Sequence, residues 1–146
     1  MKICSACLLG TKCRYNKTDA FDQKILELSK KEAIIPICPE ILAGMSIPRK
    51  AAHIVNGTGN DVIDGRAKIV EEGNNDVTKL YLDGAKKGLK IAKMLNIKEA
   101  IVFTSKGSPS CGCGKVYVSG KKVEGDGVFT TLLRRNGIKV VSNEDV

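Results

Sequence analysis

The chain has few of the residues that nucleic-acid and membrane binding usually require. It contains no tryptophan, only 4% of its residues are aromatic, and His53 is its one histidine. A stacking platform for single-stranded nucleic acid needs several aromatic side chains, so the composition gives such a platform little support. No apolar stretch approaches the length of a membrane span or a signal peptide. We therefore expect a cytoplasmic protein that does not enter a membrane.

The net charge is strongly positive, but its distribution indicates a solvated surface. A formal charge of +8 favours an anionic partner such as a nucleotide or RNA. Four lysines, however, recur at helical spacing on the expected solvated side of one helix: Lys86, Lys87, Lys90 and Lys93. Arg134 and Arg135 fall in the last turn of another helix, where cations complement the helix dipole. A tRNA partner is thus possible but not favoured.

Six cysteines stand at the ends of apolar runs. The runs and the cysteines after them are Ile3 before Cys4 and Cys7, residues 33–37 before Cys38, and residues 100–104 before a Gly/Ser/Pro loop and Cys111. If these runs are parallel strands, their carboxyl ends lie along one edge, where open α/β sheets place ligand sites. The thiols would then converge. Without a disulfide context, three or four converging thiolates indicate a metal or an iron–sulfur cluster.

The same runs predict the fold class. Strands are expected at residues 1–5, 33–38, 99–104 and 138–141, with helices between them. This order implies an α/β protein with a single domain over residues 1–146, in which a mostly parallel four-stranded sheet carries helices on both faces. We expect a Rossmann-like three-layer arrangement with short β-hairpin insertions.

Capping residues predict where the helices begin. Thr18 or Asp19 is expected to cap the first helix, Asn75 a long helix over residues 76–95, and Asp126 the last helix. Apolar periodicity places five residues of the long helix on its inner face: Leu80, Ala85, Leu89, Ala92 and Leu95.

Glycine-rich segments predict a hairpin and a loop. The hairpin is expected over residues 115–124, turning at Ser119 and Gly120. Residues 56–65 are expected to form an irregular loop. Its Asn56-Gly57-Thr58-Gly59 segment lacks the strand-then-helix setting of a dinucleotide fingerprint, so a plain turn is predicted there.

Six motifs occur in order and together resemble one known family. They are Ser5-Ala6-Cys7-Leu8-Leu9-Gly10, Cys13-Arg14-Tyr15, Pro36-Ile37-Cys38-Pro39-Glu40, Pro48-Arg49, Lys106-Gly107-Ser108-Pro109-Ser110-Cys111-Gly112 and Gly125-Asp126-Gly127-Val128. The set resembles the bacterial and archaeal domain-of-unknown-function family that includes 2-thiouracil desulfidases, and it covers essentially the whole chain. Asn16-Lys17 departs from the Asp-Gly that is usual after Arg-Tyr in relatives.

The resemblance implies a cofactor and its ligands. The family's [4Fe–4S] cluster is held by three cysteines, and its fourth iron is free to take sulfur from a thiolated pyrimidine such as 2-thiouracil, giving uracil and sulfide. Carried over by motif, the expected ligands are Cys7, Cys38 and Cys111. Cys13 also matches the family pattern and either ligates, tunes the site or packs. Cys4 and Cys113 match no cysteine position typical of the family.

Five further residues receive expected roles in this chemistry. Glu40 would act as general base or proton shuttle for the water that replaces sulfur, and Ser108 would hydrogen-bond the substrate. Arg14, Arg49 and Lys106 would hold an anionic portion of the substrate. Each has an alternative: a turn cap for Glu40, ordinary turn chemistry for Ser108 and salt bridges for the cations.

Functions of different classes remain open. The first is a desulfidase, of the hydrolase or lyase type, acting on free 2-thiouracil, and the second applies the same chemistry to 4-thiouridine in a nucleotide or tRNA. The third is a zinc-binding structural module using Cys7, Cys13, Cys38 and Cys111. A dithiol oxidoreductase using Cys4 and Cys7 is weaker, because the motif lacks the helix start that would lower a thiol pKa.

Overall fold

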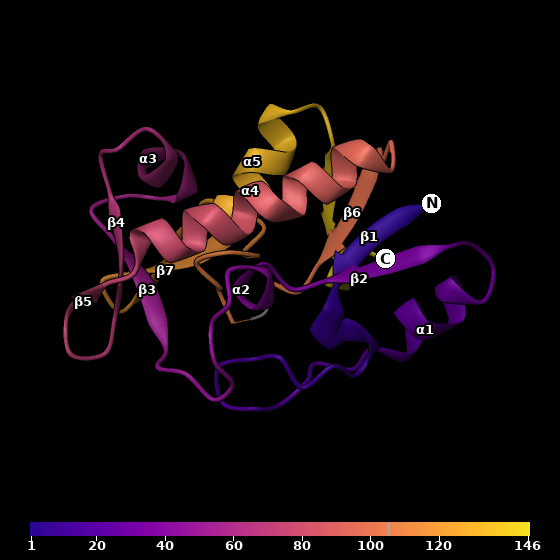
Figure 1. Ribbon diagram of the computed structural model, residues 1–146, viewed down its shortest axis with the longest axis horizontal. Coiled ribbons are helices and arrows are strands. Elements are labelled where there is room, and N and C mark those ends of the chain that lie inside the picture. The colour runs from indigo at the N-terminus through magenta and orange to yellow at the C-terminus, as the bar shows by residue number, and fades with distance from the viewer. Residues whose placement is uncertain (105) are drawn as a thin grey trace.

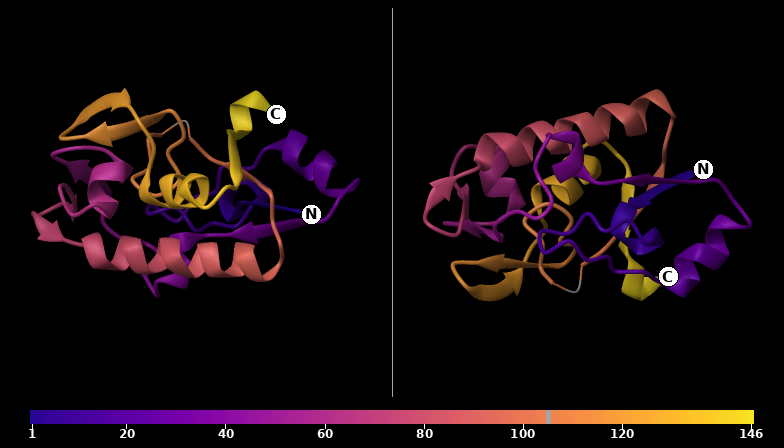
Figure 2. Two further views of the ribbon diagram at one scale, coloured as in Figure 1. Left: turned by 90° about the horizontal axis from the view of Figure 1, so that it is seen from above. Right: turned by 60° about the horizontal axis from the view of Figure 1, so that its bottom comes forward.

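The protein is built on two β-sheets, seen here in a computed structural model that describes residues 1–104 and 106–146 (Figures 1 and 2). The first sheet has the order β2 (Ile34–Ile37), β1 (Lys2–Ser5), β6 (Glu99–Val102) and β9 (Lys139–Ser142). All three of its strand pairings are parallel. The predicted α/β class with a four-stranded parallel sheet is therefore confirmed.

Alternating side chains of this sheet build a core on each of its faces. On one face, Cys4 and Ile101 pack with Leu8 and with Ile25 of helix α1 (Gln23–Ser29). On the other face, Ile3 joins a larger core to which helices α4 (Thr78–Met94) and α5 (Val128–Arg135) contribute. Helices thus cover both faces, as the sequence predicted.

A second, mixed sheet was not predicted as a unit. Its order is β5 (Asn75–Asp76), β4 (Lys68–Glu71), β3 (Ala52–Val55), β7 (Lys115–Val118) and β8 (Lys121–Glu124). The β7–β8 hairpin confirms the one expected over residues 115–124, and it turns at Ser119 and Gly120, which both have positive φ. The hairpin is part of a larger sheet because β7 pairs in parallel with β3, at Ile54 and Val118.

The segment expected as an irregular loop contains a short helix, α3 (Gly59–Ile63). Thr58 and Asp61 form a capping box, in which the Thr58 amide donates to Asp61 Oδ2 at 2.9 Å. The Asn56–Gly59 segment therefore does lie between a strand and a helix, contrary to the prediction. The Asp61 carboxylate occupies the helix start that a phosphate would need.

Helix starts differ from the predicted ones because other groups compete for the capping side chains. Asp22 caps α1, accepting from the Lys24 amide at 3.0 Å. Asp126 instead accepts from the Gly114 amide at 2.8 Å and pairs with Arg134, so α5 begins after Gly127. The long helix begins at Thr78 because the two residues expected at its start form strand β5.

Three short helices complete the element list: η1 (Ala6–Leu9), α2 (Pro39–Leu42) and η2 (Asn143–Asp145). The first two directly follow β1 and β2, so both begin at the carboxyl edge of the parallel sheet. Within the described part of the chain, no helix has the length and apolar character that crossing a bilayer demands.

Helix α4 runs past both sheets (Figure 1) and contacts other helices through its glycines. Gly84 lies against the Pro39 carbonyl of α2, and Gly88 lies against the Phe129 ring of α5. Leu80 and Leu95, predicted to face inward, are instead 43% and 40% exposed. The glycines thus let α4 approach two helices, and this contact supports the segment that carries Cys38.

We predict that Gly84→Ala lowers the free energy of unfolding by roughly 1–2 kcal/mol, although alanine is the better helix former by about 1 kcal/mol. The added Cβ would overlap the Pro39 carbonyl oxygen, which is backbone and cannot swing away. Urea unfolding measures the change. Lys86→Ala, on the exposed side of the same helix, is the control and should have little effect. An increase in stability for Gly84→Ala would contradict the contact.

Candidate active site

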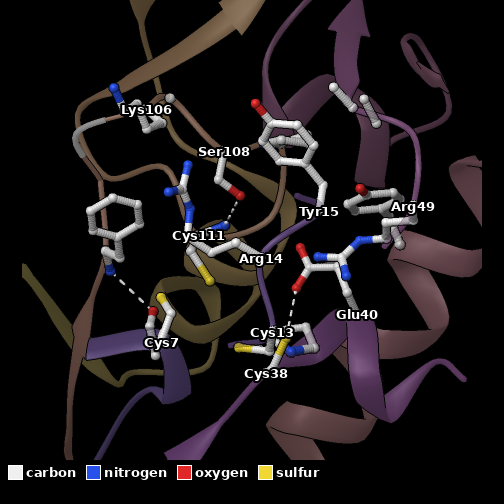
Figure 3. A pocket seen from close by; sticks show the side chains of 18 of the residues that line it. Cys7, Cys13, Arg14, Tyr15, Cys38, Glu40, Arg49, Lys106, Ser108 and Cys111 are labelled. Carbon is white, nitrogen blue, oxygen red and sulfur yellow. Dashed lines mark hydrogen bonds between the residues drawn. The ribbon is translucent and has the colours of Figure 1, made fainter. Parts of the chain in front are cut away.

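A cavity of about 670 Å³ lies at the carboxyl ends of β1 and β2 and extends to β3 and β7 of the second sheet (Figure 3). Four of the six free thiols line it: Cys7, Cys13, Cys38 and Cys111. They come from segments far apart in the sequence, and parallel pairing of β1 with β2 and β6 brings those segments to one edge. The cavity is therefore rich in soft, metal-ligating side chains.

The two short helices at the sheet edge position Cys7 and Cys38, and the loop after the first of them carries Cys13. Cys7 lies in η1, which ends at Gly10 with a φ of 93°. The Cys7 carbonyl accepts from the Ala20 amide at 2.9 Å, so the loop that carries Cys13 folds back over it. Cys38 is the N-cap of α2, and proline follows it at the first helical position, where its missing N–H leaves no bond unmade.

Backbone hydrogen bonds dock the Cys111 loop on the start of α5. The Pro109 carbonyl accepts from the Val128 amide at 2.8 Å, and the Ser110 carbonyl accepts from the Phe129 amide at 3.0 Å. These bonds satisfy amides that a helix start otherwise leaves unpaired. Gly127 is needed at this junction because a Cβ there would overlap the Ser110 carbonyl oxygen. The loop is therefore held by helix geometry.

The Ser108 side chain stabilises the Cys111 loop by hydrogen bonds within the loop. Its hydroxyl oxygen accepts from the amides of Ser110 and Cys111, both at 3.1 Å. The serine thus makes the turn that the sequence analysis named as its alternative role. A hydroxyl that accepts two amide protons still has its own proton to donate, and Ser108 lines the cavity.

The surroundings of Cys13, Cys38 and Cys111 disfavour the thiolate form of each. Hydrogen bonding with Cys13, burial and the nearby Glu40 carboxylate raise the pKa of Cys38 far above its usual value. Burial is the main cause that raises the pKa of Cys111, and the negative charge of Glu40 raises it further. For Cys13 the hydrogen bond with Cys38 lowers the pKa, but the one with Cys7 and burial raise it, to about 11 overall. Without a bound cation these thiols stay protonated.

This donor set fits an iron–sulfur cluster. Thiolates are the ligands that such clusters take from proteins, and a positive metal centre reverses the pKa argument by stabilising thiolate. The four thiols reach the cavity from three separate segments of the chain, so several ligands are available to one such group.

Glu40, Arg49 and Tyr81 line one side of the cavity. Glu40 is 8% exposed, and its Oε2 accepts from the Cys38 thiol at 3.3 Å. Burial and the Glu40 charge raise the pKa of Tyr81, while Arg49 opposes them. The Nε of Arg49 is buried and has no hydrogen-bond partner among the described residues.

Sequence reasoning missed Tyr81. The predicted inner face of the long helix contained Leu80, one position away, but Tyr81 is the buried residue. The available signal was its spacing from the small residues Gly84, Ala85 and Gly88, which share that face.

The mouth of the cavity carries the other predicted residues. The Arg14 guanidinium lies 5.3 Å from the Phe103 ring centroid and donates to Thr18 at 3.1 Å. Lys106 is exposed at the rim. In Figure 3, Lys106 lies at the top, far from Cys7 and Cys38 at the bottom. His53 also lines the cavity.

Cys4 and Cys113 do not line this cavity. Cys4 is 2% exposed in the core beneath α1, and burial raises the pKa of its thiol to about 12. Cys113 accepts from Arg134 at 3.2 Å and lines a separate hollow of about 420 Å³. The structure thus separates Cys113 from Cys111, its near neighbour in sequence.

A parallel α/β sheet with a thiol-lined cavity at its carboxyl edge defines a cysteine-rich protein suited to iron–sulfur binding. The chain belongs to the 2-thiouracil desulfurase family, whose model matches residues 3–145. This confirms the resemblance found in the sequence motifs.

Two relatives extend the comparison. The uncharacterised protein YbbK of Bacillus subtilis strain 168 is 44% identical over 149 residues, which is 100% of this chain and 97% of YbbK. The solved structure of TudS, described as a [4Fe–4S]-dependent thiouracil desulfidase, is 32% identical. It superposes with a TM-score of 0.82 over 99% of this chain and 91% of TudS. The likeness therefore extends over the whole fold.

We predict that the cluster-free protein loses stability as the pH rises above about 9. The folded chain keeps Cys4 and Cys13 protonated to about pH 12 and 11, whereas the same thiols ionise near pH 9.0 once unfolded. The unfolded state then binds fewer protons, so rising pH favours it. Urea unfolding at a series of pH values measures the effect.

Cys13→Ala should show a shallower loss of stability between about pH 9 and 11, because one of the thiols whose pKa is raised in the folded chain is gone. An equal slope in the variant and the parent protein would contradict the assigned burial of Cys13.

Proposed function

We propose that this protein is a [4Fe–4S]-dependent desulfidase that converts a thiolated pyrimidine, 2-thiouracil, to uracil and sulfide. The observation that carries the proposal is the joint placement of four thiols and a buried carboxylate on one cavity. Membership of the 2-thiouracil desulfurase family and the likeness to TudS support the same chemistry. We further propose that residues 1–146 act as one desulfidase-like domain.

We assign Cys7, Cys38 and Cys111 as the three cluster ligands. Each follows a different strand of the parallel sheet, so the three approach the cavity from separate elements. Cys13 is within hydrogen-bonding reach of both Cys7 and Cys38, which makes it the alternative ligand or a neighbour that tunes them. When bound, a cluster with three protein ligands offers one open iron, a soft Lewis acid that prefers a thiocarbonyl sulfur to an oxygen.

Glu40 is the proposed general base. In the cluster-free chain its carboxylate accepts a hydrogen bond from the Cys38 thiol. Once Cys38 serves as a thiolate that donor is gone, and the carboxylate is free to take a proton from water. Water gives one proton to Glu40 and adds its oxygen to the ring carbon of the C=S group. The C–S bond then breaks, the proton held by Glu40 and the second water proton leave with the sulfur as hydrogen sulfide, and C=O remains.

Four other side chains bind substrate in this proposal. The Ser108 hydroxyl donates a hydrogen bond to a ring carbonyl. Its oxygen already accepts hydrogen bonds from two amides, so its proton is the part left to bind substrate. The buried Nε of Arg49 adds a donor that no described residue satisfies. Arg14 and Lys106 supply positive charge at the mouth, where a negatively charged substituent would lie.

A thiolated nucleotide, or 4-thiouridine in tRNA, is the second candidate substrate. The formal charge of +8 favours an anionic substrate of this kind. The rim cation Lys106 would then face a phosphate. A comparison of turnover with 2-thiouracil, 4-thiouridine monophosphate and thiolated tRNA separates these substrates.

We predict that protein purified without oxygen is brown and contains about four irons and four sulfides per chain. Cys7→Ser, Cys38→Ser and Cys111→Ser should each abolish stable cluster binding. Cys4→Ser and Cys113→Ser are matched controls, since their thiols lie outside the cavity, and should keep the cluster. Metal analysis and visible absorption give the readout. A colourless protein with one zinc would contradict the cofactor, and cluster loss in Cys113→Ser would contradict the ligand set.

We predict that Glu40→Gln keeps the cluster spectrum but lowers turnover of 2-thiouracil by about 10²- to 10⁴-fold, the usual contribution of a general base. Glutamine preserves the size and hydrogen bonding of the side chain, so a purely structural role would survive. Glu72→Gln changes another carboxylate of the same cavity and should have little effect. Uracil formation per cluster measures both, and near-normal turnover of Glu40→Gln would remove it from the mechanism.

A further inference from the structure

The few aromatic residues of this chain are concentrated at one place. The sequence has three tyrosines, three phenylalanines and no tryptophan. Four of these six side chains line the site cavity: Tyr15, Tyr81, Phe103 and Tyr117. Tyr81 is buried, but the Tyr15 and Tyr117 side chains remain 41% and 39% exposed. Packing of the core therefore does not account for the two exposed tyrosines.

Backbone hydrogen bonds hold the two segments that carry these tyrosines. The Tyr15 carbonyl accepts from the Arg49 amide at 2.9 Å, and the Tyr117 amide donates to the Gly107 carbonyl at 3.1 Å. Gly107 also packs closely on the Tyr117 ring, because a Cβ there would lie 3.0 Å from Tyr117 Cδ2. The rings come from opposite parts of the chain, one from the loop after η1 and one from β7. Two independent segments thus present an exposed tyrosine to the same cavity.

Each of these rings also has a cation nearby. The Arg14 guanidinium carbon lies 5.9 Å from the Tyr15 ring centroid, and Lys122 Nζ lies 5.7 Å from that of Tyr117. Both distances fall within the range of cation–π contacts. Arg14 lines the site cavity, whereas Lys122 lines the separate hollow that contains Cys113. A flat ring that carries electronegative oxygen and sulfur would therefore meet an aromatic face beside the positive charge of Arg14. The thiolated pyrimidines have that chemistry.

Burial places the tyrosines beyond the reacting groups. The side chains of Cys7, Cys13, Cys111 and Glu40 are buried, and Tyr15 and Tyr117 are the exposed aromatic members of the lining. In Figure 3 Tyr15 lies above Glu40, on the side away from Cys38. If the sulfur of a pyrimidine reached the buried thiols of the cavity, the pyrimidine ring would lie on the side of Tyr15 and Tyr117.

We infer that Tyr15 and Tyr117 are specificity-determining residues that hold the pyrimidine ring of the substrate by stacking. This inference rests on the proposed function, because it assigns the ring-binding part of that site. Stacking on an aromatic side chain tolerates different ring substituents, so these tyrosines select for a flat heterocycle while other groups select its sulfur.

The test measures equilibrium binding of uracil, the unreactive product, to the cluster-loaded protein by calorimetry, together with KM for 2-thiouracil. Tyr15→Leu and Tyr117→Leu remove the aromatic face and should each weaken uracil binding by about 5- to 150-fold, the contribution of one base–aromatic stack. Tyr15→Phe and Tyr117→Phe keep the face and should bind within about twofold of the parent. Phe21→Leu is the matched control, since Phe21 is 50% exposed but does not line the cavity.

The outcomes separate the inference from the function beneath it. Unchanged uracil binding and KM in both leucine variants, at full cluster content, would overturn the stacking role. Equal losses in the leucine and phenylalanine variants would also overturn it, since they would point to the hydroxyls. If the parent protein releases no sulfide from 2-thiouracil but the leucine variants still lose uracil binding, the ring site stands and the proposed reaction fails. A parent protein that binds neither compound overturns both.

Discussion

The parallel pairing of β1 with β2 on one side and β6 on the other is the constraint on which the site depends. Because all three strands run the same way, the segments after them emerge at one edge of the sheet. Those segments are the two short helices with Cys7 and Cys38 and the loop with Cys111. An antiparallel neighbour would have sent one of these motifs to the opposite edge, and the thiols would not share a cavity.

Two contacts behind the sheet edge then fix the motifs in place. The close approach of Gly84 to the Pro39 carbonyl sets the position of α2, and the start of α5 binds the carbonyls of the Cys111 loop. Cys111 is buried and Cys38 is half-buried, and the raised pKa of both thiols favours the protonated form. Binding of a metal cluster to these thiols would release their protons, so cofactor assembly would be coupled to the stability of this edge.

The kinds of side chain that line the cavity differ between its buried end and its mouth, and this arrangement suits a desulfidase. Thiols lie at the buried end, the Glu40 carboxylate and the Ser108 hydroxyl lie nearby, and exposed tyrosines and cations surround the mouth. The sulfur of a substrate would reach a metal held by the buried thiols, while its ring and any charged substituent stayed near the mouth of the cavity. The second sheet contributes to this outer part, because β3 and β7 supply His53 and Tyr117.

Short segments of the sequence were enough to predict the parallel strands, one hairpin and the family. Apolar runs located the four parallel strands, turn residues located the β7–β8 hairpin, and the cysteine motifs led to the family. Two kinds of feature could be read only from the folded chain. One is the pairing of strands that are far apart in the sequence, and the other is which of two adjacent helix residues faces inward. The β3–β7 pairing that unites the second sheet joins segments with no shared local signal, and a shift of one residue places Tyr81 in the site in place of Leu80. Cys111 and Cys113 are two positions apart, yet only Cys111 lines the cavity, because the backbone bonds that dock its loop on α5 set which way each side chain points.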